Sequence, residues 1–246
     1  MIHLAIETTT DRLSVAGRVA GQGGQADSRT AARVFEGARM HAAKLFPLIE
    51  EVLQELEVRV DQVGALAMAD GPGSFTGLRV GAAAAKALAR AQPDLSIWTA
   101  STLLVRAAGA AAPRGAHVLV VTSALRGELY AATYRLDLPN TVETLMAPTL
   151  AVPESLHRET PDLLVVDAPD RLVDRLADQF AVPLVRGGAS LPSATALLGL
   201  IGVPGAAEHL GNVDGWEPRY GRLAEAQIRW EAAHGRALPD SSGNPR

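Results

Sequence analysis

The sequence predicts an α/β protein in two lobes. This prediction comes from an opening run of short strand patterns, a change to helical periodicity near residue 45, and a further alternation of strand and helix patterns beyond residue 100. A length of 246 residues suits one large domain or two modest lobes. We expect lobes at residues 1–100 and 101–215, followed by a helix and tail at 216–246.

The composition is that of a globular protein, with 48% hydrophobic and 20% charged residues. The formal net charge of −4 predicts no general electrostatic attraction to nucleic acid. The chain has no cysteine, which excludes disulfides, thiolate metal sites and a cysteine nucleophile. Neither a signal peptide nor an unbroken apolar stretch of membrane-spanning length is visible, and we expect a cytoplasmic protein.

In the first half, apolar residues alternate in short runs and then recur with helical spacing. The glycine-rich stretch 21–24 favours a hairpin turn. Pro47 lies inside the first helical pattern, where it either kinks the helix or marks its start. The second helix consists of small residues, which allow a neighbouring element to approach closely. We expect strands at Ile2–Glu7, Leu13–Ala20, Gln25–Ala32 and Val63–Ala69 and helices at Leu45–Leu56 and Leu78–Ala91.

The second half shows the same alternation less regularly, which favours a second lobe of mixed strands and helices. The last residues, 237–246, are typical of a frayed tail. We expect strands at Ser96–Thr99, His117–Thr122, Glu128–Leu136, Leu163–Asp167 and Val182–Arg186 and helices at Ser101–Ala111, Asp170–Gln179, Pro192–Ile201 and Ala224–His234.

The most conspicuous motif is the glycine-rich loop Asp70–Gly77, between a strand and a helix. A helix start there could present amide groups to a phosphate, but the lysine of a P-loop is missing and the dinucleotide fingerprint is out of register. A tight packing turn is favoured over phosphate binding, and Ser74 and Thr76 are favoured as helix caps over nucleophiles. Glu7 either orders a hydrated magnesium ion, as in an ATPase, or accepts backbone hydrogen bonds in its own turn.

No metal site is expected. The histidines are far apart in sequence, and no two of them have the spacing of ligands on one helix. They are His3, His41, His117, His157, His209 and His234.

The stretch Gly71–Gly81 closely resembles the TsaB family, bacterial proteins needed to make threonylcarbamoyladenosine in transfer RNA. Further matches follow in the family's order and extend the resemblance to about residue 235. They are the opening strand Leu4–Thr9, the helix His41–Ile49, and the segments Ala85–Ala89, Arg126–Tyr130 and Glu217–Tyr220.

The resemblance implies an actin-like ATPase fold (ASKHA, RNase H-like) in two lobes, without a catalytic site. The family is related to TsaD, the subunit that transfers the threonylcarbamoyl group and carries a His-x-x-x-His metal pair. The corresponding places here hold Thr102 and Arg106. A threonine hydroxyl is a poor ligand for iron or zinc and a guanidinium is not a ligand, so neither a metal nor another cofactor is expected.

The function implied by the resemblance is that of a non-catalytic partner of TsaD. The modification concerns the adenosine next to the anticodon in transfer RNAs that read codons beginning with A. We expect TsaD in a heterodimer or larger complex, the ATPase TsaE as a further subunit, a homodimer of the free chain through the same surface, transfer RNA contact only through the complex, and no membrane contact.

The resemblance also implies where partners lie, on the two helices of the first lobe. The implied partner interface comprises His41, Leu45, Leu48, Ile49, Val52, Gly77, Val80, Gly81, Ala84, Ala85 and Leu88. Residues expected near a nucleotide, if one binds, are Glu7, Gly71, Gly73, Ser74 and Thr76.

The chain departs from the family at three places. Glu7 stands where the family has aspartate, Ser123 and Leu125 replace the charged residues of an Asp-Ala-Arg motif, and Ala224–His234 is an extension. Three other functions stay open: an ATPase or sugar kinase of the same fold that uses Glu7 and the glycine loop, a metallopeptidase, and a direct binder of transfer RNA.

Overall fold

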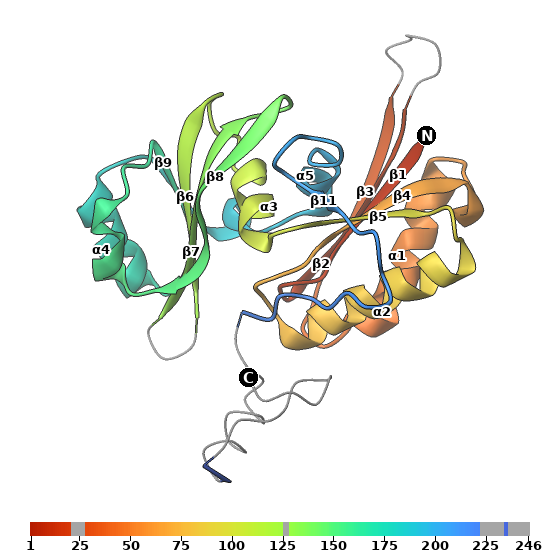
Figure 1. Ribbon diagram of the computed structural model, residues 1–246, viewed down its shortest axis with the longest axis horizontal. Helices are drawn as coiled ribbons and strands as arrows, with labels where there is room; N and C mark the ends of the chain where they lie inside the picture. Colours follow the sequence, from red (N-terminus) through yellow and green to blue (C-terminus); the bar gives the residue numbers. More distant parts are fainter. Residues whose placement is uncertain (21–27, 125–127, 222–233, 236–246) are drawn as a thin grey trace.

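The computed structural model describes residues 1–20, 28–124, 128–221 and 234–235. Two β-sheets stand side by side, with two short helices between them and the longer helices on the outer sides (Figure 1). None of the described helices is long and apolar enough to cross a membrane.

The first sheet has the strand order β11-β5-β4-β1-β2-β3. β1 pairs antiparallel with β2 and parallel with β4, so the chain forms a meander and then returns through helical crossovers. The strands are β1 (Ile2–Glu7), β2 (Arg12–Val19), β3 (Arg29–Glu36), β4 (Val63–Ala69), β5 (Ser96–Ala100) and β11 (Glu208–His209).

The second sheet has the strand order β10-β9-β6-β7-β8. β6 pairs antiparallel with β7 and parallel with β9, as β1 does with β2 and β4 in the first sheet. The strands are β6 (Ala116–Ser123), β7 (Leu129–Asp137), β8 (Thr141–Ala151), β9 (Leu163–Asp167) and β10 (Leu184–Val185).

The two sheets therefore repeat one topology, in which the third, second, first, fourth and fifth strands of each half are neighbours in that order. This duplication confirms the prediction of a two-lobed α/β fold of the actin-like type. β11 departs from the repeat and lies in a stretch expected in the second lobe. It pairs instead with β5, where it covers the edge that this strand would otherwise leave free.

The helices divide between the outer sides and the middle of the molecule (Figure 1). α1 (His41–Glu55) and α2 (Phe75–Ala91) cover the outer face of the first sheet, and α4 (Asp170–Phe180) covers that of the second. α3 (Thr102–Gly109) follows the first sheet but packs on β6 and β7, whereas α5 (Ala194–Leu198) follows the second sheet but packs on β1 and β2. Each lobe thus supplies a helix to the other lobe's inner face.

Most predicted elements are confirmed, with several differences. α2 begins at Phe75 rather than Leu78, and β11 was not predicted. The first helix begins at His41 and contains Pro47 in its interior. The third strand begins at Arg29 rather than residue 25, and β8 was not predicted because its apolar and polar residues do not alternate. The hairpin turn at 21–24 lies outside the described residues, as does the helix at Ala224–His234 apart from its last residue.

Short 3₁₀ helices connect the larger elements, and η1 (Val60–Gln62) precedes β4. η3 (Pro153–Arg158) takes the place between β8 and β9 that α1 takes between β3 and β4. η4 (Gly187–Ser190) joins β10 to α5 and lies between the two lobes, where it contacts β9 and α3.

Candidate functional site

The glycine-rich loop between β4 and α2 wraps around the turn that follows β1. A side chain at Gly77 would collide with the carbonyl oxygen of Thr8, and a Cβ at Gly73 would lie 2.6 Å from that of Thr9. The Ser74 amide donates to the same Thr9 oxygen at 2.7 Å. The glycines therefore permit backbone-to-backbone packing, which confirms the interpretation of the loop as a tight turn.

The start of α2 is satisfied from within the chain. Ser74 is the N-cap residue, and its Oγ accepts a hydrogen bond from the Gly77 amide at 3.2 Å. Thr76, two positions further on, is exposed on the helix surface. The capping role expected for Ser74 is confirmed, and Thr76 is free to face a neighbour.

Glu7, at the end of β1, is completely buried. Its Oε1 accepts hydrogen bonds from the Thr9 amide at 2.7 Å and the Thr9 hydroxyl at 2.5 Å, while Oε2 has no hydrogen-bond partner among the described residues. Burial raises the pKa of Glu7 to about 7, opposed by the Thr9 bonds and by the positive charges of Arg106 and Arg12. Glu7 is thus a turn carboxylate, and no solvent-facing oxygen is left to order a hydrated ion.

The two positions that correspond to the TsaD metal pair have other tasks here. Arg106 is buried on α3, where its Nη2 lies 2.8 Å from Asp167 Oδ2 and its Nη1 donates to the Ser190 carbonyl oxygen at 2.8 Å. Thr102 is buried one turn earlier, and its amide donates to the Gly71 carbonyl oxygen at 2.8 Å. Among the described residues, no three His, Asp or Glu side chains gather as metal ligands would.

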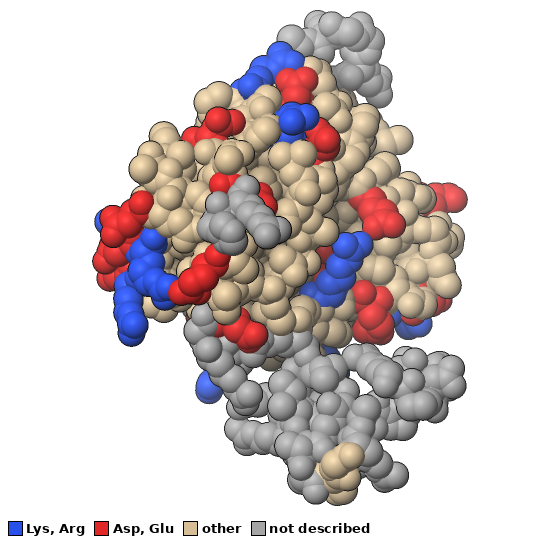
Figure 2. Space-filling model, turned by 60° about the vertical axis from the view of Figure 1, so that its left-hand side comes forward, with Lys and Arg blue, Asp and Glu red and all other residues tan. Residues whose placement is uncertain are grey.

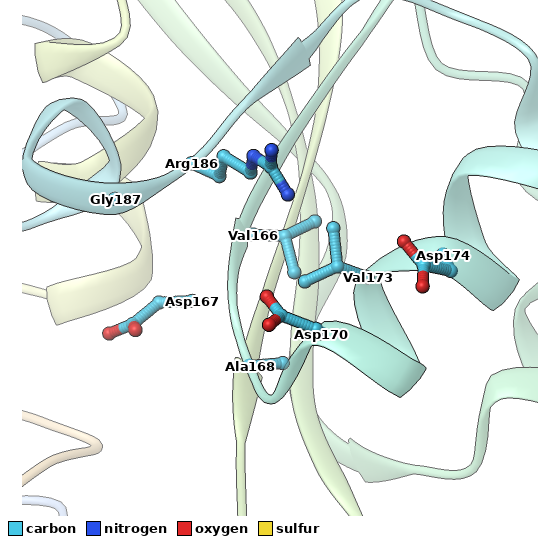
Figure 3. Close-up of a pocket in the computed structure, with 8 residues that line it drawn as sticks. All are labelled: Val166, Asp167, Ala168, Asp170, Val173, Asp174, Arg186 and Gly187. Carbon is cyan, nitrogen blue, oxygen red and sulfur yellow. The ribbon is translucent and has the colours of Figure 1, made fainter.

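A pocket of about 580 Å³ opens at the carboxyl ends of β9 and β10 (Figure 3). Arg186 and Asp170 extend over its valine floor from opposite sides, and Asp167 points away from it. The pocket is therefore lined by both a positive and a negative side chain. The full lining is Val166, Asp167, Ala168, Asp170, Val173, Asp174, Arg186 and Gly187.

Most residues of the implied partner interface lie in the chain's own core. The apolar stripes of α1 and α2 cover the first sheet, so the side chains that carry the helical periodicity face inward. The partner interface stays a prediction, and most of the side chains expected in it are covered in the free chain. Buried are His41, Leu45, Leu48, Ile49, Val52, Gly77, Gly81, Ala84 and Ala85, whereas Val80 and Leu88 are half-buried.

The outward faces of the same two helices carry charged residues, among them Glu50 and Glu51 on α1 and Arg79 on α2, together with a group of small and apolar side chains. Phe46 on α1 is 50% exposed, and Ala83 and Ala87 are exposed on α2. Ala42 and Ala43 extend the surface at the start of α1. We call Ala42, Ala43, Phe46, Thr76, Ala83 and Ala87 the outer face of the first lobe.

Residues 210–221, which we call the strap, run along α2 on the side away from α1 (Figure 1). Their contacts leave Thr76, Ala83 and Ala87 uncovered, because the strap contacts other positions of the helix. The contacts are Arg90 with Asp214 at 2.9 Å, Lys86 with Glu217 at 3.3 Å, and the rings of Phe75 and Tyr220 at 4.8 Å between centroids.

The strap also closes over the glycine loop. Asp70 is buried, its Oδ2 lies 3.2 Å from Arg219 Nε, and its carbonyl oxygen accepts from the Arg219 amide at 2.7 Å. Burial raises the pKa of Asp70 to about 6, opposed by the charge of Arg219. Gly71 has φ +114°, and a side chain there would collide with the Arg219 carbonyl oxygen. The residues expected near a nucleotide are therefore packed against chain segments or, for Thr76, lie on the outer face.

The sequence analysis missed the pairs Arg106–Asp167 and Arg219–Asp70. The Arg106–Asp167 pair could have been suspected from the sequence, because Arg106 lies inside the apolar stretch Leu103–Ala107. A buried arginine needs a carboxylate or carbonyl partner. The second had no local signal, since its partners are far apart in the chain.

On the molecular face drawn in Figure 2, basic and acidic side chains lie interspersed over the described surface. The distribution agrees with the nearly balanced count of 23 basic and 27 acidic residues. This face offers no broad basic area of the kind that binds nucleic acid.

A protein-family model described as "TsaD: tRNA N6-adenosine threonylcarbamoyltransferase" matches residues 35–178. The chain is similar to the tRNA threonylcarbamoyladenosine biosynthesis protein TsaB of Escherichia coli (strain K12), with 35% identity over 54% of this chain and 55% of that protein. It is also similar to TsaB of Bacillus subtilis (strain 168), with 25% identity over 77% of this chain and 83% of that protein. The chain spans 35% to 55% of the length of three curated relatives that it matches.

Among solved structures, the chain is similar to an uncharacterized protein of Pseudomonas aeruginosa described as having similarity to peptidase YEAZ. The TM-score is 0.71 at 25% identity, over 90% of this chain and 99% of that chain. A second structure, YeaZ from Pseudomonas aeruginosa, has a TM-score of 0.64 at 26% identity, over 82% of this chain and 90% of that chain.

Proposed function

Since the chain belongs to the TsaB family, a group within the wider family described by the TsaD model, we propose that it is a non-catalytic partner subunit of a TsaD-type threonylcarbamoyltransferase. In this role it takes part in making threonylcarbamoyladenosine in transfer RNA. The modified base is the adenosine next to the anticodon in transfer RNAs that read codons beginning with A.

The observation that carries this proposal is the outer face of the first lobe. The corresponding outward positions of α4 in the second lobe are charged, among them Asp174, Arg175 and Asp178. α1 and α2 also expose charged residues, such as Glu50 and Arg79, but unlike α4 they expose Phe46, Ala83 and other small residues as well. An exposed apolar helix surface of this kind suits docking of another helical surface, because small side chains let two helices approach closely.

The middle of the molecule supports a non-catalytic role. Glu7 is buried and bonded to Thr9, and Arg106 fills the space between the lobes with an ion pair to Asp167. An ATPase or kinase would need a carboxylate that reaches water or a bound metal ion. The capped start of α2 likewise leaves few amides for a phosphate.

The proposal also includes the further partners that the resemblance implies. The TsaD-type subunit binds the outer face of the first lobe, a TsaE-type ATPase joins the complex, and transfer RNA is held by the complex. In the absence of partners, a second copy of the chain covers the same outer face. The complex works in the cytoplasm.

The test is co-purification with the TsaD-type protein of the same genome, by size-exclusion chromatography with light scattering. Phe46→Asp and Ala83→Arg each place a charge on the outer face without touching the core. We expect each to weaken the complex by about tenfold or more. Ala84→Arg is unsuitable for this test, because Ala84 is only 4% exposed.

The matched control is Leu145→Asp, which changes an exposed apolar residue (41%, against 50% for Phe46) on β8 of the second lobe. It should leave the complex intact. Loss of the complex with Leu145→Asp but not with Phe46→Asp would move the interface to the second lobe. A wild-type chain that does not bind and instead hydrolyses ATP, with loss of hydrolysis in Glu7→Gln, would replace the proposal by an ATPase.

A further inference from the structure

The two lobes meet at a point where the carboxyl ends of parallel strands from both sheets converge. Glu7 ends β1 of the first sheet and Asp167 ends β9 of the second. In open α/β sheets this edge is where ligands bind, since loops diverge there and leave a crevice. In this chain Arg106 lies at the end of β9, where it pairs with Asp167 at 2.8 Å.

Arg106 joins three parts of the molecule. It lies on α3, which packs on the second sheet, and it pairs with Asp167 of that sheet at 2.8 Å. It donates to the carbonyl oxygen of Ser190 in η4 at 2.8 Å. It also interacts electrostatically with Glu7 of the first sheet. A guanidinium suits this position because its planar fork can donate in several directions at once.

η4 is held from the opposite side by a second arginine. Arg12, at the start of β2 in the first sheet, donates from Nη1 to the carbonyl oxygen of Gly188 at 3.4 Å. The side chain of Ser190 donates to Gly187 within the same turn, so η4 is tied internally as well. η4 therefore lies between an arginine from each lobe, and Ser190 is completely buried.

The chain then continues from η4 into α5, which packs on the first sheet. Ser14 of β2 accepts a hydrogen bond from the Ala194 amide at 2.9 Å, and this bond is buried. A change in the angle between the lobes would disturb the contacts that hold η4 and α5, those of Arg106, Arg12 and Ser14, and the apolar core that both lobes share. Arg106 is buried whereas Asp167 is half-exposed, so separating the two would leave a buried guanidinium without its charge partner, which is unfavourable.

We propose that Arg106, together with Asp167, Arg12 and η4, takes the place of a bound ligand between the lobes and holds them at one fixed angle. The chain is thus a rigid platform that stays closed without a nucleotide, whereas a ligand-closed α/β protein opens when its ligand leaves. This inference concerns the free chain and does not depend on the proposed partner.

The absence of cysteine makes a direct distance measurement simple. Cysteines introduced at Glu50 on α1 and Asp178 on α4, both exposed, carry spin labels on the outer helices of the two lobes. We expect the doubly labelled chain without further substitutions to give one narrow distribution of the distance between the two labels. Addition of ATP with magnesium should leave this distribution unchanged. Arg106→Ala should shift the distribution to longer distances and broaden it. Millimolar guanidinium should restore the narrow distribution, because it replaces the missing group.

Two further variants keep the test decisive if Arg106→Ala folds poorly. Asp167→Asn changes a side chain that is 44% exposed and should fold, yet it removes the charge partner of Arg106 and should broaden the distribution. Arg114→Ala breaks an exposed pair with Asp137 inside the second lobe and should leave the distribution unchanged. Distributions in Asp167→Asn and Arg106→Ala as narrow as in the wild type would overturn the proposal, and so would a wild-type chain that closes only with ATP.

Discussion

The two lobes share one strand order but differ in the helices that cover them. Between its third and fourth strands the first lobe has the 15-residue helix α1, whereas the second has the 6-residue turn η3. The outward positions of α1 and α2 combine charged residues with exposed apolar and small ones such as Phe46 and Ala83, whereas those of α4 are charged or polar. A duplicated topology therefore does not carry a duplicated surface, and among the described elements only the first lobe presents two adjacent helices with small and apolar outer side chains.

The first prediction separates the inner from the outer side of α2 and has the largest expected effect. Ala84 is buried, so Ala84→Arg should destabilise the protein by about 4 kcal/mol or more, because it buries an unpaired charge and overpacks the core. Ala83 is exposed, so Ala83→Arg should change the free energy of unfolding by less than about 0.5 kcal/mol. Urea denaturation measures both. Equal effects would contradict the assignment of the outer face.

The second prediction concerns the turn that the first lobe has and the second lacks. Gly77→Ala should destabilise by about 3 kcal/mol, because the new methyl group would meet the carbonyl oxygen of Thr8 and force the backbone apart. Gly188 in η4 has open space around it, and Gly188→Ala should be close to neutral. Thermal unfolding of the two variants beside the wild type provides the comparison, and a neutral Gly77→Ala would argue against the close approach.

The third prediction is a pH dependence that originates in the first lobe. In the unfolded chain Glu7 loses its proton near its ordinary pKa of 4.5, whereas in the native protein its pKa is about 7. The native state therefore keeps a proton that the unfolded state has released. The contribution of Glu7 to stability is complete below about pH 4.5 and is lost as the pH rises to about 7, by up to about 3 kcal/mol.

Glu7→Gln mimics the protonated form and should be more stable than the wild type at about pH 8, with little difference at about pH 4. The pKa of Asp70 is also raised, to about 6, so its ionisation likewise lowers the free energy of unfolding as the pH rises. Asp70 is present in both proteins, and its effect therefore cancels when the variant is compared with the wild type. Urea denaturation across this pH range measures the difference. A variant less stable than the wild type at high pH would mean that ionised Glu7 is favoured in the native state.

The smallest expected effect is in the second lobe. The exposed pair Arg114–Asp137 has good geometry, at 2.7 Å, yet solvent screens it. Arg114→Ala should lower the free energy of unfolding only slightly, and by less at high salt. Denaturation at two salt concentrations tests this, and an effect that grows with salt would point to a contribution other than the ion pair.

Much of the fold could be predicted from local sequence. Alternation in Ile2–Glu7 and the helical stripe from Leu45 to Leu56 determine which residues face the core, because burial of apolar area favours these periods. The glycines of the loop after β4 indicate a close backbone approach, which Gly77 makes against Thr8. β8 escaped prediction because a long edge strand exposed on both faces leaves no alternating pattern.

The candidate site depended on contacts between distant segments. The apolar stripes of α1 and α2 were correct as helix faces, but the same periodicity serves the chain's own core, so the partner surface stays a prediction that the stripes alone do not locate. Arg106 was recognised as an unsuitable metal ligand, yet its partner Asp167 lies 61 positions later in the chain. No local pattern links two such positions.

The sequence by itself determined the order of strands and helices, the inward face of each helix and the tight turn at the glycine loop, because these follow from the local period of apolar residues and from backbone sterics. Only the tertiary structure decided which outward residues stay uncovered and which charges meet between the lobes. Lys86 and Glu217, for example, are 131 positions apart, and their contact helps to place the strap on one side of α2. Such pairings depend on how whole lobes pack, and the energy that selects them comes from burial summed over many residues rather than from any one segment.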